Sequence, residues 1–220
     1  MKVADLGIMP YRQAWAMQEE IHAQVLDGAP ERLLLLEHPP VITHGRRPEG
    51  AEHLLASQDR LNQLGVELVP SDRGGDITFH GPGQLVAYPI LRLNDHGWSV
   101  GRYVRVLQES VIEALADFGV TARREEGVIG VWTEDGAKIC AIGVRIRRGV
   151  SLHGLALNVC TDLRYFDLIV PCGLAGRPVT SLKKILGDRA PSMRQTKDAL
   201  IRAMKEAVRL SVASSSAGRV

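Results

Sequence analysis

Two hairpin signals in the second half of the chain constrain its fold most. The pairs Asp135-Gly136 and Arg148-Gly149 each separate two apolar runs. Such pairs favour the tight turns that connect neighbouring antiparallel strands, because turn residues with positive φ angles suit the twist of the strands. Three consecutive strands are therefore predicted, over residues 128–133, 138–147 and 150–159.

Long amphipathic helices are predicted before and after these strands. Apolar residues recur at helical spacing over 10–26 and 100–118, and a glycine follows each segment as a stop signal. A last helix is predicted to begin near Ser192, because Ser192 and Gln195 have the spacing of a capping box. Further strands are predicted over 31–37, 41–45, 66–69, 76–80 and 84–93, and short or weak helices over 51–64, 163–168 and 181–186.

This mixture of elements predicts an α/β (α+β) fold in which a mixed β-sheet is flanked by helices. No internal repeat or linker divides the chain, so we expect residues 1–210 to form a single domain. The segment 211–220 is rich in Ser and Ala, and we expect a disordered tail there.

The charge balance and the cysteine count limit the possible partners and location. The chain has 220 residues, with 27 Lys and Arg against 25 Asp and Glu, and a net charge of +2. A nucleic-acid-binding protein is expected to carry a clustered basic excess, so no nucleic acid is expected as a partner. A signal peptide and a membrane-spanning apolar run are both missing, which predicts a cytoplasmic protein without membrane association. Three cysteines without a CxxC pair predict reduced thiols rather than a disulfide framework.

The most unusual stretch runs from Asp72 to Gln84, with the sequence DRGGDITFHGPGQ. Glycines let a backbone approach a ligand closely, and an arginine beside them supplies fixed hydrogen-bond donors. The segment matches neither a Walker loop nor a GxGxxG motif. Two tight turns around one short strand, with Arg73 and Asp76 paired at the surface, would produce the same pattern, and the residue types leave both interpretations open.

Cys172 is the cysteine whose context differs from the others. Cys140 and Cys160 lie in apolar strand patterns and are expected to be buried core thiols. Cys172 lies between Pro171 and Gly173 in a loop, where a thiol can be presented to a ligand. Such a thiol is a nucleophile only where a positive group lowers its pKa.

Lys138 and three histidines are candidate partners for a thiol. Lys138 opens an apolar strand, and strand alternation places it on the face of Cys140 and Ile142 if it points inward. It could then serve Cys140, or Cys172 if folding brings that residue close. A Cys172–His80 pair would resemble a thiol hydrolase, and His44 and His153 are further candidates. The histidines lack metal-ligand spacing, so no metal site is expected.

Five blocks of the chain, in order, resemble the lipoyl(octanoyl) transferase family. They begin at His38, Arg73, Lys138, His153 and Pro171, and read HPPVIT, RGGDITFHGPGQL, KICAIGVRI, HGLALNV and PCG. The similarity extends over roughly residues 5–210. It implies a fold like the catalytic domain of biotin and lipoate protein ligases, with a mixed sheet flanked by helices.

The resemblance also implies an activity, partners and roles for individual residues. Members of this family move an octanoyl group from acyl carrier protein to a lysine of a lipoyl domain, in 2-oxoacid dehydrogenase complexes or the glycine cleavage H protein, without a cofactor. Cys172 matches the nucleophile that forms the acyl thioester, and Lys138 matches the group that lowers its pKa and acts as acid or base. The segments that match the acyl site comprise Arg73, Gly74, Gly75, Asp76, Ile77, Thr78, Phe79, His80, Ala141, Ile142, Gly143, Gly154, Leu155 and Ala156.

Three alternatives accompany this expectation. An ATP-dependent lipoate or biotin ligase shares the implied fold but needs no nucleophilic cysteine. A thiol hydrolase would form the same thioester and transfer the acyl group to water, and a non-enzymatic binding protein would form no adduct. If the transferase expectation holds, the basic run Arg145, Arg147 and Arg148 is a candidate docking patch for an acidic carrier protein.

Overall fold

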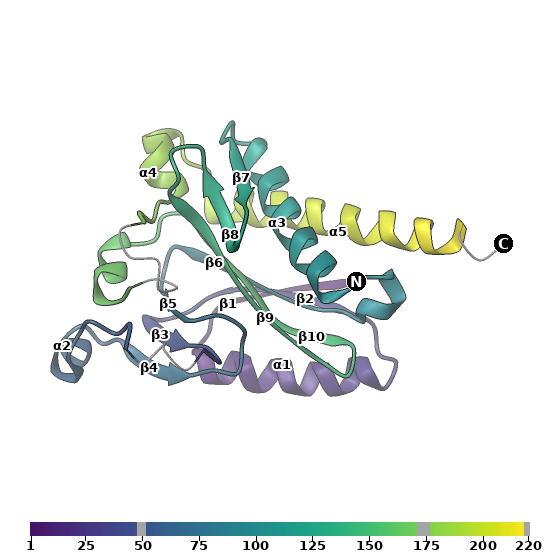
Figure 1. The fold of residues 1–220 in the computed structure, drawn as a ribbon, viewed down its shortest axis with the longest axis horizontal. Coiled ribbons are helices and arrows are strands. Elements are labelled where there is room, and N and C mark those ends of the chain that lie inside the picture. The colour runs from purple at the N-terminus through teal and green to yellow at the C-terminus, as the bar shows by residue number, and fades with distance from the viewer. Residues whose placement is uncertain (48–51, 171–176, 218–220) are drawn as a thin grey trace.

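The computed structural model describes residues 1–47, 52–170 and 177–217, with the side chains given as far as Ser211 (Figure 1). Its largest element is a seven-stranded sheet in the order β1-β2-β6-β10-β9-β8-β7. The first pair, β1 (Lys2–Ile8) and β2 (Arg32–Glu37), is parallel, and the other pairs are antiparallel. These remaining strands are β6 (Gln84–Ile90), β10 (Val150–Asn158), β9 (Lys138–Arg147), β8 (Val128–Thr133) and β7 (Ala122–Glu125). The sheet is therefore mixed, as the sequence predicts.

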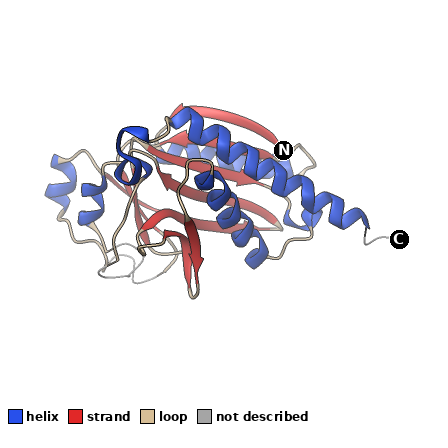
Figure 2. Ribbon diagram, turned by 90° about the horizontal axis from the view of Figure 1, so that it is seen from above, coloured by secondary structure: helices blue, strands red, loops and turns tan. Residues whose placement is uncertain are grey.

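Helices cover both faces of this sheet. Helix α1 (Tyr11–Leu26) lies along one face, and α3 (Val100–Ala116) and α5 (Met193–Ala217) lie on the opposite face (Figures 1 and 2). Side chains on β2 alternate between the two resulting cores: Leu33 and Leu35 pack with α3 and α5, and Leu34 and Leu36 pack with α1. Burial on both faces explains why this strand is a continuous apolar run in the sequence.

A smaller sheet lies beside the large one, in the order β4-β3-β5. It consists of β3 (Val41–His44), β4 (Glu67–Pro70) and β5 (Ile77–His80), with β3 parallel to β4 and antiparallel to β5. Its apolar side packs with α2 (Gln58–Gln63) and the 3-10 helix η3 (Leu163–Leu168), where the rings of Phe79 and Tyr165 stack with centroids 4.7 Å apart. Three short elements complete the fold: η2 (Leu93–His96), α4 (Leu182–Leu186) and η5 (Gly187–Arg189).

Both predicted hairpin turns and the predicted helix cap are confirmed. Gly136 has a φ of 79°, and Arg148 and Gly149 have φ angles of 53° and 80°, as expected for a two-residue turn. At the start of α5, the backbone N–H of Ser192 donates to the Gln195 side chain at 2.9 Å, and that of Gln195 donates to the Ser192 hydroxyl at 3.3 Å. These reciprocal bonds are a capping box.

The end of α5 differs from the expected tail. The helix continues past residue 210 to Ala217, so most of the segment 211–220 has helical backbone where disorder is predicted. The Ser211 hydroxyl donates to the carbonyl of Val208 and bonds His96 on η2, at 2.7 and 3.0 Å. These bonds hold the helix at the point where the sequence predicts that it ends.

No helix in the described parts of the chain is long and apolar enough to cross a lipid bilayer.

Candidate active site

A pocket lies where the small sheet meets β9 and β10 of the large sheet. Its empty space, including the part open to solvent, is about 470 Å³. Eleven of the residues in the predicted acyl-site segments line it: Arg73, Gly75, Asp76, Thr78, His80, Ala141, Ile142, Gly143, Gly154, Leu155 and Ala156. A second, smaller pocket of about 280 Å³ is also lined by Thr78, Ala141 and Ala156. The two pockets are therefore adjacent and share these residues as a common wall.

Strand alternation removes two of the predicted residues from this pocket. Thr78 and His80 face it from β5, whereas Ile77 and Phe79 point to the other side and pack in the core of the small sheet. Gly74 is absent from the pocket lining because it pairs with β9, where its N–H donates to the carbonyl of Val144 at 2.9 Å. Ile77, Phe79 and Gly74 therefore hold the segment in place without facing the pocket.

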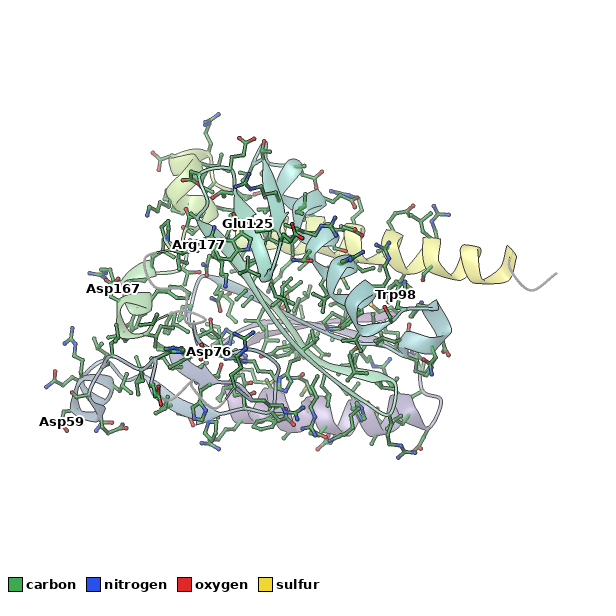
Figure 3. All side chains as sticks on the ribbon, viewed as in Figure 1. Asp59, Asp76, Trp98, Glu125, Asp167 and Arg177 are labelled. Carbon is green, nitrogen blue, oxygen red and sulfur yellow. The ribbon has the colours of Figure 1, made fainter. Side chains whose placement is uncertain are left out.

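Arg73 is buried at the pocket, not paired with Asp76 at the surface. Its guanidinium donates to the hydroxyl of Thr43 at 2.9 and 3.1 Å and to the carbonyl of Thr43 at 2.6 Å. Asp76, which is labelled in Figure 3, is 2 % exposed. It pairs with His53 at 2.6 Å, while its other oxygen accepts the N–H of Ile77. The two turns around the short strand β5 are present, but the expected surface ion pair between Arg73 and Asp76 is wrong.

A chain of hydrogen bonds fixes the orientation of the polar side chains that follow Arg73. The amide nitrogen of Gln84 donates to the Phe79 carbonyl and to Asn158, so its oxygen accepts from Nδ1 of His80 at 2.8 Å. Nε2 of His80 then lies 3.5 Å from the Thr43 hydroxyl, and the amide of Asn158 donates to Thr180 at 3.0 Å. Burial lowers the pKa of His80 well below its usual value. His80 is neutral and both of its ring nitrogens have partners.

A β-bulge decides which way Lys138 faces. Val131 pairs with Cys140 and Trp132 pairs with Lys138, so Ile139 is an extra residue on β9. Ile139 and Cys140 both pack in the core under α3 and α5, whereas Lys138 lines the smaller pocket. The expectation that Lys138 shares a face with Cys140 is therefore wrong, because the bulge interrupts the alternation.

Two contacts place the ammonium group of Lys138. The side chain is buried, with 6 % of its residue surface exposed, and its Nζ lies 4.7 Å from the centre of the Trp132 ring. Arg177, which pairs with Glu125 on β7, lies against the same ring at 4.0 Å (Figure 3). Stacking on a tryptophan stabilises a cation in a partly dry environment.

The two cysteines that the structure describes differ in their surroundings. Cys140 is fully buried, and burial raises its pKa to about 12, so it is a core thiol as predicted. Cys160 is exposed and not buried, because β10 ends at Asn158 and the chain turns over Gly83, whose carbonyl accepts the N–H of Cys160. Cys172 lies outside the described residues.

Both described ends of the segment that contains Cys172 are held at the site. Before it, the N–H of Val170 donates to the carbonyl of His53, the residue that pairs with Asp76. After it, the N–H of Lys138 donates to the carbonyl of Pro178 at 2.8 Å, and that of Thr180 to the carbonyl of Lys138 at 2.9 Å. The residue before this segment, Val170, is therefore held beside His53, and Pro178, which follows the segment, is held beside Lys138.

Several pocket residues were missed by the sequence analysis. Tyr11, Val86 and Tyr88 line the pocket, and His38 lies behind it, bonded to Tyr88 at 2.8 Å. Tyr11 belongs to the apolar pattern of α1, and Tyr88 to a strand that is buried throughout, so no local signal distinguishes them. His44 is half-exposed at the end of β3 and does not line the pocket.

His153 combines an unusual backbone conformation with a hydrogen bond to a carboxylate. Its φ is 57°, and its Nε2 donates to Asp72 at 2.6 Å, which also pairs with Arg145. Burial lowers the pKa of His153 to about 3, so the imidazole is neutral. Its Nδ1 is buried and has no hydrogen-bond partner among the described residues. A left-handed conformation at a buried residue that lines a pocket is strained, and such strain is concentrated at functional sites.

The lipoyl protein ligase A/B catalytic domain family matches this chain over residues 10–205. The chain belongs to this family. A relative from Chloroflexus aggregans, an octanoyltransferase, is 52 % identical over 204 residues and covers 91 % of both chains. The resemblance to the lipoyl(octanoyl) transferases is thereby confirmed, and the chain is an acyltransferase.

Solved structures of lipoate ligases show the same fold. A lipoate-protein ligase A bound with ATP superposes with a TM-score of 0.80 at 20 % identity, over 94 % of this chain and 85 % of that one. A putative lipoate protein ligase from T. acidophilum with bound lipoic acid gives a TM-score of 0.77 at 22 % identity, over 95 % of this chain and 87 % of that one. The expected ligase-like fold is confirmed.

Proposed function

We propose that this acyltransferase moves an octanoyl group from acyl carrier protein to a lysine of a lipoyl domain, through a thioester on Cys172. The observation that carries the proposal is the bulge on β9. It turns Lys138 away from the core thiol Cys140 and toward the pocket, beside which the segment containing Cys172 begins and ends.

Cys172 follows Val170 by two residues in the sequence. The N–H of Val170 donates to the carbonyl of His53, and the ring of His53 lies 2.6 Å from the carboxylate of the pocket residue Asp76. A cationic Lys138 near this thiol would stabilise the thiolate, which is the nucleophilic form.

The transfer divides into two balanced steps. The Cys172 thiolate attacks the carbonyl carbon of octanoyl-carrier protein, the bond from that carbon to the carrier's sulfur breaks, and the departing carrier thiolate takes the proton of the cationic Lys138. The neutral amine of the acceptor lysine then attacks the Cys172 thioester and forms an amide. The amine loses one proton to the now neutral Lys138, the bond from the acyl carbon to the Cys172 sulfur breaks, and the Cys172 thiolate is regenerated. A covalent intermediate of this kind gives ping-pong kinetics.

The pocket suits a saturated acyl chain. Four small residues, Ala141, Gly143, Gly154 and Ala156, contribute to its wall from β9 and β10. Each methylene group that is buried there contributes about 0.8 kcal/mol. Acceptors would be the lipoyl domains of 2-oxoacid dehydrogenase complexes and the H protein of glycine cleavage, as the resemblance implies.

Two alternatives make different use of the same site. A thiol hydrolase that uses His80 as its base is disfavoured, because both ring nitrogens of His80 are occupied and its pKa is lowered. A ligase would activate free octanoate with ATP, so octanoate plus ATP is the second donor to test beside octanoyl-carrier protein.

Adduct mapping tests the proposal. The protein is incubated with octanoyl-carrier protein, and the added mass is located by peptide analysis. We expect the octanoyl adduct on Cys172, its loss in Cys172→Ser, and its retention in the matched control Cys140→Ser. Lys138→Met should slow acylation and change its dependence on pH. An adduct on Cys140 that persists in Cys172→Ser would refute the assignment.

A further inference from the structure

Two exposed arginines lie next to the candidate active site. Arg46 and Arg47 follow β3 and are exposed. Among the residues that the structure describes, neither side chain has an ion-pair or hydrogen-bond partner. They lie in sequence directly after Gly45, in a segment that packs against the glycine-rich wall of the pocket.

Backbone contacts hold these two residues against that wall. The N–H of Arg46 donates to the carbonyl of Arg73 at 3.0 Å, and that of Arg47 to the carbonyl of Gly75 at 3.3 Å. Arg73 and Gly75 both line the pocket. A Cβ at Gly45 would lie 2.4 Å from the carbonyl oxygen of Gly75, so this close approach requires glycine. The backbone is therefore held against the wall of the pocket, and the two side chains are exposed.

Two carboxylates of the described residues lie beside this wall, and both already have other partners. Asp72 pairs with Arg145 and His153, and Asp76 lies 2.6 Å from a ring nitrogen of His53. Among the described residues, neither carboxylate pairs with Arg46 or Arg47, so the two positive charges are exposed at this edge of the pocket.

The run Arg145–Arg148 is less suited to docking than the sequence suggests. Arg145 pairs with Asp72, and Arg147 pairs with Glu19. A partner that bound these two arginines would have to break an existing ion pair at each of them.

The donor in the proposed reaction carries a matching charge close to its thioester. Carrier proteins hold acyl groups on a phosphopantetheine arm, in which a phosphodiester joins the arm to the protein. Arginine recognises phosphate through two parallel hydrogen bonds. The acceptor instead presents a lysine, whose ammonium group is repelled by two guanidinium groups before it loses its proton.

We propose that Arg46 and Arg47 bind the phosphate of the donor's phosphopantetheine arm and so guide the thioester into the pocket. This inference rests on the proposed octanoyl transfer. It assigns the two arginines to the donor step and not to the acceptor step.

The test compares three donors in single-turnover acylation, measured as release of the donor thiol. The donors are octanoyl-carrier protein, octanoyl-phosphopantetheine, and octanoyl-pantetheine, which lacks the phosphate. The variant is Arg46→Glu with Arg47→Glu, and the matched control is Arg105→Glu. Arg105 is an exposed arginine on α3, on the opposite side of the sheet.

We expect the double variant to lower the second-order rate constant about tenfold with both phosphate-containing donors and to leave octanoyl-pantetheine unaffected. The same loss should be produced in the wild type by raising the salt concentration, because exposed charges are screened. Arg105→Glu should behave like the wild type with all three donors.

Four results would overturn the assignment. A loss with the carrier protein alone would place the arginines against the carrier's surface, and an equal loss with all three donors would indicate damage to the pocket. A higher KM for the lipoyl domain with unchanged acylation would assign them to the acceptor. If the wild type released no thiol from any donor, the transfer function itself would be refuted, and this proposal with it.

Discussion

Acidification should destabilise this protein well above the pH at which carboxylates titrate. Three buried histidines are responsible: burial lowers the pKa of His38 to about 4 and of His153 to about 3, and lowers that of His80 well below 6.5. His38 shows the cause most clearly. Its Nδ1 donates to the carbonyl of Met9 at 2.7 Å and its Nε2 accepts from the Tyr88 hydroxyl at 2.8 Å, so no position remains for a second proton.

The sign of the effect follows from the direction of these shifts. Because the pKa of each histidine is lower in the folded state, its contribution to stability is complete above the unfolded pKa of about 6.5 and is lost as the pH falls toward the folded value. At about pH 5.5, each histidine that stays neutral in the folded state lowers the free energy of unfolding by about 1.4 kcal/mol relative to neutral pH. Three of them cost about 4 kcal/mol, a large part of the 5–15 kcal/mol typical of a domain.

Urea unfolding between about pH 7.5 and about pH 5.5 measures this loss. His38→Gln removes one of the three titrating groups, so the loss should decrease from about 4 to about 3 kcal/mol. The comparison uses the change with pH, so the stability that His38→Gln itself removes at pH 7.5 does not affect it. A wild-type stability that is the same at both pH values, or an equal loss in His38→Gln, would refute the reasoning.

Two further predictions concern close packing and helix capping. In Gly143→Ala the new Cβ would lie 2.7 Å from the backbone oxygen of Gly74, so we expect a loss of about 1–3 kcal/mol in urea unfolding and slower acylation. The control is Gly101→Ala on α3, where a Cβ meets nothing within 4 Å. This variant should be neutral or stabilising by about 0.5 kcal/mol. A loss of stability as large as that in Gly143→Ala would contradict the packing argument. Ser192→Ala removes the capping box with Gln195 and should lower the free energy of unfolding by about 1 kcal/mol. Ser192→Thr keeps a hydroxyl and should retain most of this stability. Equal losses in the two variants would show that the cap does not act through its hydroxyl.

Elements with a strong local pattern could be predicted from the sequence, and elements at the sheet edges could not. The helices, both hairpins and the capping box follow from periodicity and turn residues. Strand β1 was missed because its side chains are mostly exposed or half-exposed, so no apolar alternation marks it. Strand β7 has the sequence ARRE and lies at the opposite edge, where charged residues protect an open edge from pairing with other chains.

The limits at the site have a different physical origin. The sequence blocks indicated segments that line the two pockets, but a bulge is formed between two strands and leaves no clear mark in either sequence. Lys138 was therefore assigned to the same face as Cys140, which it does not share. The burial of Arg73 could not be predicted from the local sequence either, because its hydrogen-bond partner Thr43 is thirty residues away along the chain.

The hydrogen-bond chain from Arg73 to Thr180 affects how the pocket is solvated. Its members that line the two pockets include Arg73, His80, Gln84 and Asn158, all polar, yet they bond to one another and to neighbouring backbone groups. A hydrocarbon guest that lies against such a wall displaces weakly held water. The donors and acceptors of these four side chains keep their hydrogen-bond partners when it binds. By contrast, a guest with its own hydroxyl or amide would lose hydration there and gain no new partner from these groups. A polar wall of this kind therefore selects for an apolar guest.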